Sequence, residues 1–251
     1  MHQPIIDKEP NVSKPYFVQL YQYCFDNRTK EIIYAEYTIE NPQLFDSDLL
    51  QEEQTHEFKP VGLDYSNVAT FYRKNDYNVP RMVGMPEFMP FALMRKPLYR
   101  YDAAAPLNEE LDEMWSEFVK NLKKKISKKT HRIRVYSGVY DRKRVHGSSQ
   151  YLDKKSTLHP SPFAFWLLLH NEDHSEGISF IMHNYAFDYF EERHQKLCER
   201  SICTEAGLED SIPNPREYNY TMFYCCRSSA ITKLYPFKKV KDDEILKFEE
   251  K

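Results

Sequence analysis

Glycine is scarce in this sequence, with 6 residues among 251. Loops that hold nucleotide phosphates need several glycines close together, because the backbone itself must approach the phosphates. No segment offers such a cluster, which excludes P-loop and Rossmann-type nucleotide binding. Aromatic residues are abundant instead, with 19 Tyr and 16 Phe. Together with a 41% share of hydrophobic side chains, they suffice for the core of one large domain or two small ones.

Long hydrophobic runs are also missing. The longest apolar stretch covers residues 163–169, whereas a membrane-spanning helix needs about 20 apolar residues. We therefore expect no transmembrane helix and no membrane partner. The first four residues show no apolar run behind a basic start, so we expect no signal peptide in this sequence.

An excess of basic charge is absent as well. The chain has 35 Lys+Arg and 38 Asp+Glu, which gives a formal net charge of -3. A protein built mainly to coat nucleic acid is normally much more basic. Any polyanion-binding site is therefore expected to be a local patch.

Cysteine pairs with metal-binding spacing are absent too. A zinc site needs four suitably spaced Cys or His ligands, and no Cys-x-x-Cys pair occurs here. The five cysteines are Cys24 alone, Cys198 near Cys203, and Cys225 next to Cys226. This clustering favours disulfides over reduced core cysteines, and the odd number leaves one thiol over.

The chain divides into a leader, one domain and a tail. Residues 1–15 carry three prolines among polar residues, which predicts a loose leader. Residues 16–25 and 31–39 are strand-like and predict a hairpin, and residues 41–77 and 79–97 are expected to be long irregular connections. A single domain is expected over 16–240, and 241–251 forms a charged tail.

The clearest predicted element is a helix over residues 108–128, because apolar residues recur at spacings of three or four. Acidic residues fill its first turns and lysines its end, which matches the helix dipole. Residues 132–139, 163–170 and 178–183 predict strands, and 187–198 a second helix. Trp115 and Trp166 lie in apolar runs and are expected in the core. Since helices and strands interleave without a βαβ rhythm, we expect an α+β domain with an antiparallel sheet.

Four segments, in this order along the chain, carry a further pattern. They are Ala-Ala-Ala-Pro at 103–106 with Leu111, Asp112 and Trp115; Val-Tyr-Ser-Gly-Val-Tyr at 135–140; Tyr-Leu at 151–152 with residues 160–166, 177–181 and Asn184; and Cys198, residues 203–207 and Phe-Tyr-Cys-Cys at 223–226. Their order and spacing resemble the DNA/RNA non-specific endonucleases, especially the secreted arthropod branch that includes insect double-stranded ribonucleases. The resemblance covers roughly residues 18–230. It implies that the domain expected over 16–240 is similar to the DNA/RNA non-specific endonucleases.

The resemblance implies a ββα-metal (His-Me finger) nuclease fold, with an antiparallel sheet flanked by helices and a one-metal phosphodiesterase site. In that family, a histidine in an Arg-Gly-His motif is the general base, an asparagine holds hydrated Mg²⁺, and a downstream glutamate orders the waters of the metal. The secreted enzymes also carry cysteines at both late positions. A disulfide from Cys198 or Cys203 to Cys225 or Cys226 is therefore implied.

The catalytic residues of the family are not matched in this chain. Arg81 stands at the position of the base, Ala103 at the asparagine before Ala-Pro, and Val119 at the glutamate. Arginine stays protonated at physiological pH and cannot accept a proton from water. Asp112 takes the place of the metal-binding asparagine and is a weak metal candidate, although a first-turn helix acid is the simpler interpretation. We expect a catalytically inactive protein without a cofactor, with Mg²⁺ required if any activity survives.

Arg81 and the basic run over 120–134 each allow two interpretations. Arg81 is either an ion-pair residue at the rim of the core or a phosphate contact. The basic run holds eight Lys/Arg and is either a sequence-independent DNA or RNA site or a solvated helix end. Lys124 lies roughly 18 Å along the helix from Asp112, so the run is separate from the former catalytic centre. The residues expected to contact a polyanion are Lys123, Lys124, Lys128 and Arg132.

Three functions therefore remain open. The chain is a pseudonuclease that binds nucleic acid or another polyanion, an Mg²⁺-dependent nuclease with a rerouted site, or a secreted protein with an interaction or structural role. In the third case we expect Met82, Met85 and Met89 to fill the cleft that holds the active site in the resembled family. The resemblance implies secretion, and a cytoplasmic location stays open. His170, His174 and His183 flank one predicted hairpin, where solvated histidines are expected more often than a metal site.

Overall fold

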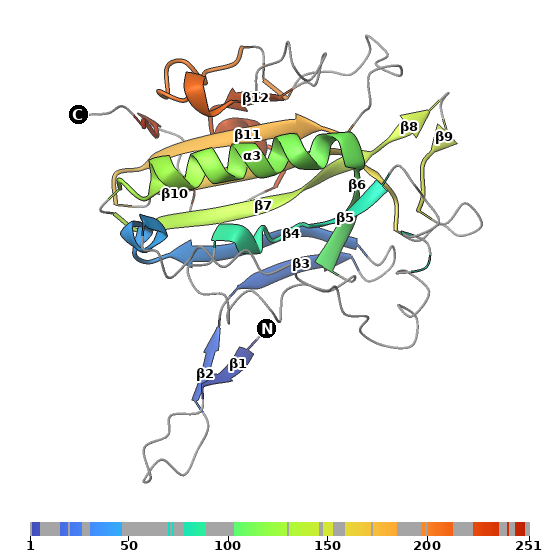
Figure 1. Ribbon diagram of the computed structural model, residues 1–251, viewed down its shortest axis with the longest axis horizontal. Helices are drawn as coiled ribbons and strands as arrows, with labels where there is room; N and C mark the ends of the chain where they lie inside the picture. The colour runs from blue at the N-terminus through green and yellow to red at the C-terminus, as the bar shows by residue number, and fades with distance from the viewer. Residues whose placement is uncertain are drawn as a thin grey trace.

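The protein is an α+β structure, seen here in a computed structural model. It describes residues 2–5, 16–19, 21–26, 31–46, 70, 72, 78–88, 103–129, 131–145, 148–152, 159–171, 173–184, 197–198, 200–212, 223–235, 240 and 244–248. Within these ranges seven strands form one sheet, in the order β12-β11-β10-β7-β4-β3 with β13 beside β11. All pairs are antiparallel except β11 with β13. The predicted α+β class and the mostly antiparallel sheet are confirmed (Figure 1).

Strands β4, β7, β10 and β11 follow the predicted strands closely, and β12 and β13 were not predicted. The bounds of the sheet strands are β3 (Gln22–Asp26), β4 (Glu31–Ile39), β7 (Ile133–Arg142), β10 (Pro162–Asn171), β11 (Glu176–His183), β12 (Phe223–Cys226) and β13 (Glu244–Ile245). Every residue of β10 is buried, because this central strand is covered on both faces. Its unbroken apolar run therefore places it at the centre of the sheet.

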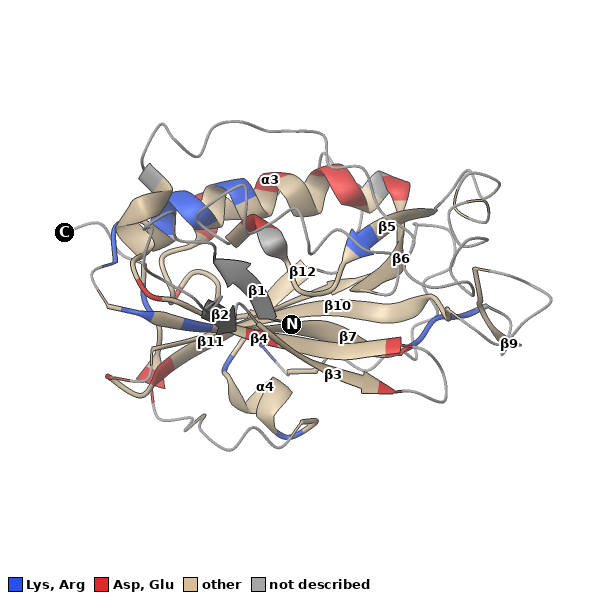
Figure 2. Ribbon diagram, turned by 90° about the horizontal axis from the view of Figure 1, so that it is seen from below, with Lys and Arg blue, Asp and Glu red and all other residues tan. Residues whose placement is uncertain are grey.

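Helix α3 (Glu109–Ile126) covers one face of the sheet, as predicted. Its Trp115 and Phe118 are buried, and Phe118 packs on Phe180 of β11 and Phe223 of β12 at centroid distances of 5.0 and 4.5 Å. Figure 2 shows α3 above the sheet and the short helix α4 (Ser229–Thr232) below it. The recurrence of apolar residues every three or four positions therefore predicted both the helix and the face that it buries.

The opposite face of the sheet carries an aromatic cluster. Trp166 of β10 stacks on Tyr235 at a centroid distance of 5.3 Å, and both donate a hydrogen bond to the carbonyl of Val139. A Cβ atom at Gly138 would lie 2.3 Å from the Trp166 ring. Glycine is therefore needed there for the indole to lie flat against β7.

The adjacent cysteines of β12 bond to two different partners. Cys226 pairs with Cys198 and Cys225 with Cys203, at Cα separations of 5.8 and 5.0 Å. Successive strand residues point to opposite faces, and accordingly Cys225 joins the core under α3 while Cys226 joins the core on the other face. The predicted late disulfides are confirmed, and Cys24 is the thiol left over.

The chain ends differ from their predicted form. In place of a wholly loose leader, β1 (His2–Ile5) pairs with β2 (Tyr16–Gln19). The run predicted as one strand over 16–25 is therefore two strands, β2 and β3. The charged tail contributes β13, and its Leu246 and Phe248 are buried in the main core, because these apolar residues alternate with charged ones.

Two further predictions need comment. The segment predicted as irregular over 79–97 contains β5 (Asn78–Met82), which pairs with β6 (Ala104–Asn108). Two short strands, β8 (Arg144–Val145) and β9 (Ser148–Ser149), form a small separate ribbon. The helix predicted over 187–198 lies outside the described residues except at its end, where Leu197 and Cys198 form a bend. Among the described helices, none is long and apolar enough to cross a bilayer.

Candidate functional site

The candidate site is built on β5, β6 and α3, which follow one another as a hairpin and a helix. The hairpin register places Pro80 opposite Pro106 and Arg81 opposite Ala105, and β6 runs directly into α3. Asn184, at the end of β11, fixes this junction. Its side chain accepts a hydrogen bond from the Asn108 amide at 2.8 Å and donates to the carbonyls of Pro106 and Pro162. The fully buried Asn184 thereby ties the hairpin and helix to the main sheet.

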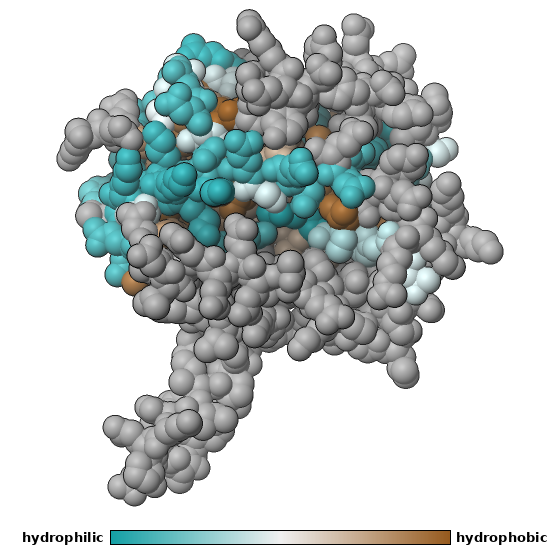
Figure 3. All heavy atoms as spheres, viewed as in Figure 1, coloured by the Kyte–Doolittle hydropathy of each residue, from teal (hydrophilic) through white to brown (hydrophobic). Residues whose placement is uncertain are grey.

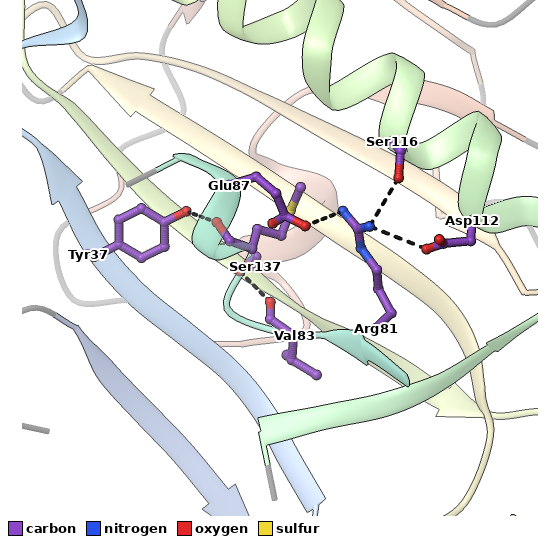
Figure 4. Close-up of polar contacts among 8 residues, drawn as sticks. Tyr37, Arg81, Val83, Glu87, Asp112, Ser116 and Ser137 are labelled. Atoms are coloured by element: carbon purple, nitrogen blue, oxygen red, sulfur yellow. Dashed lines mark hydrogen bonds and ion pairs between the residues drawn. The ribbon is translucent and has the colours of Figure 1, made fainter. Parts of the chain in front are cut away.

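Arg81 lies at the centre of this unit and is 7% exposed. Its Nη2 atom lies 2.8 Å from Glu87 Oε1, and its Nη1 atom lies 3.3 Å from Asp112 Oδ1. Nη1 also donates a hydrogen bond to Ser116 Oγ at 3.3 Å. Figure 4 shows the guanidinium between the loop that carries Glu87 and the helix that carries Asp112 and Ser116. Arg81 is thus a buried ion-pair residue rather than an open phosphate contact.

The loop after β5 is held in a fixed conformation. Met85 has a φ of 47°, which is uncommon for a residue other than glycine. Its carbonyl accepts a hydrogen bond from the Tyr37 hydroxyl at 2.9 Å, and the Val83 carbonyl accepts one from Ser137 at 2.6 Å. Burial, with a smaller effect of Glu87, raises the pKa of Tyr37 well above its usual value. These contacts to β4 and β7 position Glu87 beside Arg81.

The two other positions that the resemblance matches to catalytic residues, Ala103 and Val119, hold no polar side chain. Ala103 is buried, and its carbonyl accepts a hydrogen bond from the Val83 amide at 3.0 Å. Val119 is buried in the core and lies on the same side of α3 as Asp112 and Ser116, because the three are spaced by four and three residues. Neither residue can bind or activate water.

The residues around Arg81 do not fit a Mg²⁺ site. The resemblance implies a hydrated Mg²⁺ on a carboxylate or amide oxygen, and Asp112 and Glu87 are the two carboxylates available among the described contacts of this centre. Both already face the guanidinium. A divalent cation about 4 Å from the Arg81 guanidinium would be repelled by about 8 kcal/mol at an effective dielectric constant of about 20, so Asp112 is better explained as a partner of Arg81.

The basic residues at the end of α3 form a separate surface. Lys124, Lys128 and Arg132 are exposed, whereas Lys123 is half-buried with Nζ 5.5 Å from the Phe45 ring centroid. Figure 2 shows acidic residues at the start of α3 and basic residues at its end. The exposed face of α3 is hydrophilic over its length (Figure 3). The four predicted polyanion contacts thus share one end of the helix, three of them exposed to solvent.

The three histidines of the β10–β11 hairpin do not converge. His170 and His183 are buried, and His183 Nε2 lies 3.0 Å from the Tyr224 hydroxyl. His174 is exposed in the turn between the strands. Burial raises the pKa of Tyr224, which keeps its hydroxyl neutral beside His183. Within the described residues, no group of three or more His, Cys, Asp or Glu side chains could hold a metal ion.

Two residues of the centre are missing from the sequence-based prediction. Glu87 has no spacing relative to Arg81 that marks it as a partner, because their contact depends on the conformation of the loop after β5. Ser116 lies four residues after Asp112 and therefore on the same helix face, a spacing that could have suggested it. No family model matches this chain, and no significantly similar sequence is found among curated proteins.

Proposed function

We propose that this chain is a nuclease-fold protein of the ββα-metal type that no longer cuts nucleic acid. The observation that carries this proposal is the hairpin β5–β6 followed directly by α3, with Arg81 and Asp112 in contact across it. This is the order of elements that the resemblance to DNA/RNA non-specific endonucleases implies. Arg81 and Asp112 occupy the positions matched to the general base and the metal ligand.

The chemistry of the centre supports inactivity. Phosphodiester hydrolysis needs a base for the attacking water and a cation on the phosphate oxygens. A guanidinium does not accept a proton, and each of its two carboxylate neighbours forms an ion pair with it through one oxygen. None of the hydrogen bonds that Arg81, Glu87 and Asp112 form with described residues involves a histidine. The alternative of a rerouted nuclease site therefore gains no support.

A polyanion is the ligand we propose for the basic end of α3. Lys124, Lys128 and Arg132 present three exposed cations there, on a chain whose net charge is slightly negative. Point charges of this kind contact phosphates without reading bases. We therefore propose sequence-independent binding of DNA or RNA, remote from the former catalytic centre. The two disulfides support a location in an oxidising compartment.

A second candidate function is a structural or protein-interaction role. Met82 and Met85 are 3% and 2% exposed and belong to the main core, which favours a filled centre over an open cleft. Met89 lies outside the described residues. This candidate shares the prediction of inactivity but not that of polyanion binding.

One experiment separates these functions. The protein is mixed with a fluorescently labelled RNA duplex, with Mg²⁺ or with EDTA, and both anisotropy and the integrity of the duplex are followed. Salt-sensitive binding of an intact duplex supports the pseudonuclease, and no binding up to high protein concentration supports the structural role. Cleavage that requires Mg²⁺ would overturn the proposal.

A further inference from the structure

Two exposed histidines from different elements meet at one end of the central sheet. The Nε2 atoms of His131 and His174 lie 3.2 Å apart. Their rings are 4.4 Å apart between centroids and are inclined by 72°. His131 precedes β7, and His174 lies in the turn between β10 and β11.

The sheet itself brings these residues together. β7 and β10 are antiparallel with Arg134 opposite His170. His131 comes three residues before Arg134 and His174 four residues after His170, so both lie beyond the same end of the sheet. The register thus places both residues at the same end of the sheet.

The turn that carries His174 is well defined. The Asn171 side chain accepts a hydrogen bond from the Asp173 amide at 3.2 Å and donates one to Glu176 at 3.5 Å. Ser175 adopts a φ of 52°, which closes the tight connection. A turn fixed at both ends limits the positions of the His174 ring, so little ordering is needed when a ligand binds.

We propose that His131 and His174 form a binding site for a divalent transition-metal ion such as Zn²⁺ or Cu²⁺. A Zn–N bond is about 2.0–2.1 Å, and two nitrogens on a tetrahedral ion are then about 3.3 Å apart. The observed separation of 3.2 Å matches this value. Neutral imidazole nitrogen is a preferred ligand of Zn²⁺ and Cu²⁺, whereas Mg²⁺ prefers oxygen.

The surroundings allow an ion to enter and complete its coordination. Both rings are exposed, so water is available for the remaining coordination positions. Arg132 is the nearest basic neighbour in sequence and opposes the ion electrostatically. A site with two protein ligands is weaker than a structural zinc site with four. It links the start of β7 to the β10–β11 turn, and it does not depend on the proposed nucleic-acid function.

Calorimetric titration of the full chain with Zn²⁺, Cu²⁺ and Mg²⁺ tests this site. We expect one equivalent of Zn²⁺ or Cu²⁺ to bind, with no detectable binding of Mg²⁺. Either His131→Ala or His174→Ala should weaken binding at least ~10-fold, since even changes outside the ligand shell cost 10–100-fold. His159→Gln is the control, because His159 precedes β10 at its opposite end.

A second measurement removes the dependence on variants. The electron paramagnetic resonance spectrum of the wild-type chain with one equivalent of Cu²⁺ should show coupling to two imidazole nitrogens. Affinity should also fall as the pH is lowered, because imidazole must be neutral to bind a metal. Unchanged Zn²⁺ affinity in the doubly substituted chain, a spectrum with one nitrogen or none, or no binding of either ion would each overturn the proposal.

Discussion

Arg81 Nη2 and Glu87 Oε1 lie 2.8 Å apart at a place where the Arg81 side chain is 9% exposed. Asp112 lies on the other side of the guanidinium at 3.3 Å. A strand, a loop and a helix thus each contribute one charge to a single cluster, in which Arg81 is buried and the two carboxylates are partly exposed. Removing a member of a buried ion pair leaves its partners desolvated and unpaired, which costs far more than the pair contributes.

The first prediction concerns this cluster. Arg81→Met should lower the free energy of unfolding by about 2 kcal/mol, because the buried guanidinium is lost while the Glu87 and Asp112 side chains, 26% and 37% exposed, remain partly solvated without it. Urea unfolding followed by circular dichroism measures the loss. Adding Glu87→Gln and Asp112→Asn should recover most of it, since no unpaired charge remains.

A matched control comes from a more exposed ion pair. Arg142 Nη2 lies 3.3 Å from Glu31, and the Arg142 side chain is 36% exposed. Arg142→Met should therefore cost less than about 1 kcal/mol. Equal losses for the Arg81 and Arg142 variants would contradict the buried charge cluster.

The second prediction concerns the disulfides. Replacing Cys203 and Cys225 with alanine should reduce the free energy of unfolding by about 3 kcal/mol, because the bridge closes a loop with a sequence separation of 22 residues. Cys24→Ala should have a smaller effect, since this thiol closes no loop. Denaturant unfolding of the oxidised proteins measures both. A loss for Cys24→Ala as large as that of the bridge variant would argue against this assignment.

The sequence predicted the main sheet and α3 well because their apolar patterns are regular. The strands at 132–139, 163–170 and 178–183 and the helix at 108–128 carry uninterrupted periodicity that agrees with their tertiary packing. The late disulfides were predictable for a different reason, since the resemblance placed cysteines in two neighbouring segments. The local apolar pattern is therefore enough to define the strands and the helix, whereas the disulfides followed from the resemblance.

The hairpin β5–β6 could not be predicted in the same way. Pro80 and Pro106 lie directly opposite each other in it, and proline normally indicates a break or an edge strand. The burial of Arg81 also depends on Glu87 and Asp112, which lie six and 31 residues away along the chain. Its environment exists only after the loop at 83–88 is fixed by Tyr37 and Ser137. Sequence alone therefore identified Arg81 and offered an ion pair as one of two roles, but it did not identify the partners of that ion pair.

The third prediction concerns salt dependence. If duplex DNA binds at the end of α3, changing Lys124, Lys128 and Arg132 to Glu should flatten the slope of log affinity against log salt by at least about 2.7, at about 0.9 per phosphate contact. Lys123→Glu should change the slope less, because Lys123 lies over Phe45. Anisotropy titrations over a salt series measure the slope. An unchanged slope in the triple variant would make the basic end a solvated face.

The fourth prediction concerns alkaline pH. Burial raises the pKa of Tyr235 to about 12, against about 10 in an unfolded chain. The folded state therefore keeps a proton that the unfolded state loses, so this stabilisation is complete below pH 10 and is lost between pH 10 and 12. Tyr235→Phe should reduce the steepness of this loss by roughly 1.4 kcal/mol per pH unit.

Urea unfolding at a series of pH values, in a Cys24→Ser background that prevents thiol exchange, measures this effect. The hydrogen bond from Trp166 to the Val139 carbonyl remains in Tyr235→Phe, so the variant should fold. The same pH dependence with and without the Tyr235 hydroxyl would show that its titration does not contribute.

The most direct test of the central claim is a nicking assay on supercoiled plasmid and double-stranded RNA with Mg²⁺, Mn²⁺ or EDTA. With Arg81 paired to Glu87 and Asp112, and with the apolar Val119 at the position that the resemblance assigns to a glutamate, we predict no cleavage above a buffer blank under any of these conditions. The same should hold for Asp112→Ala. Cleavage by the wild-type chain that is abolished both by EDTA and by Asp112→Ala would contradict the account and establish a working metal site at this centre.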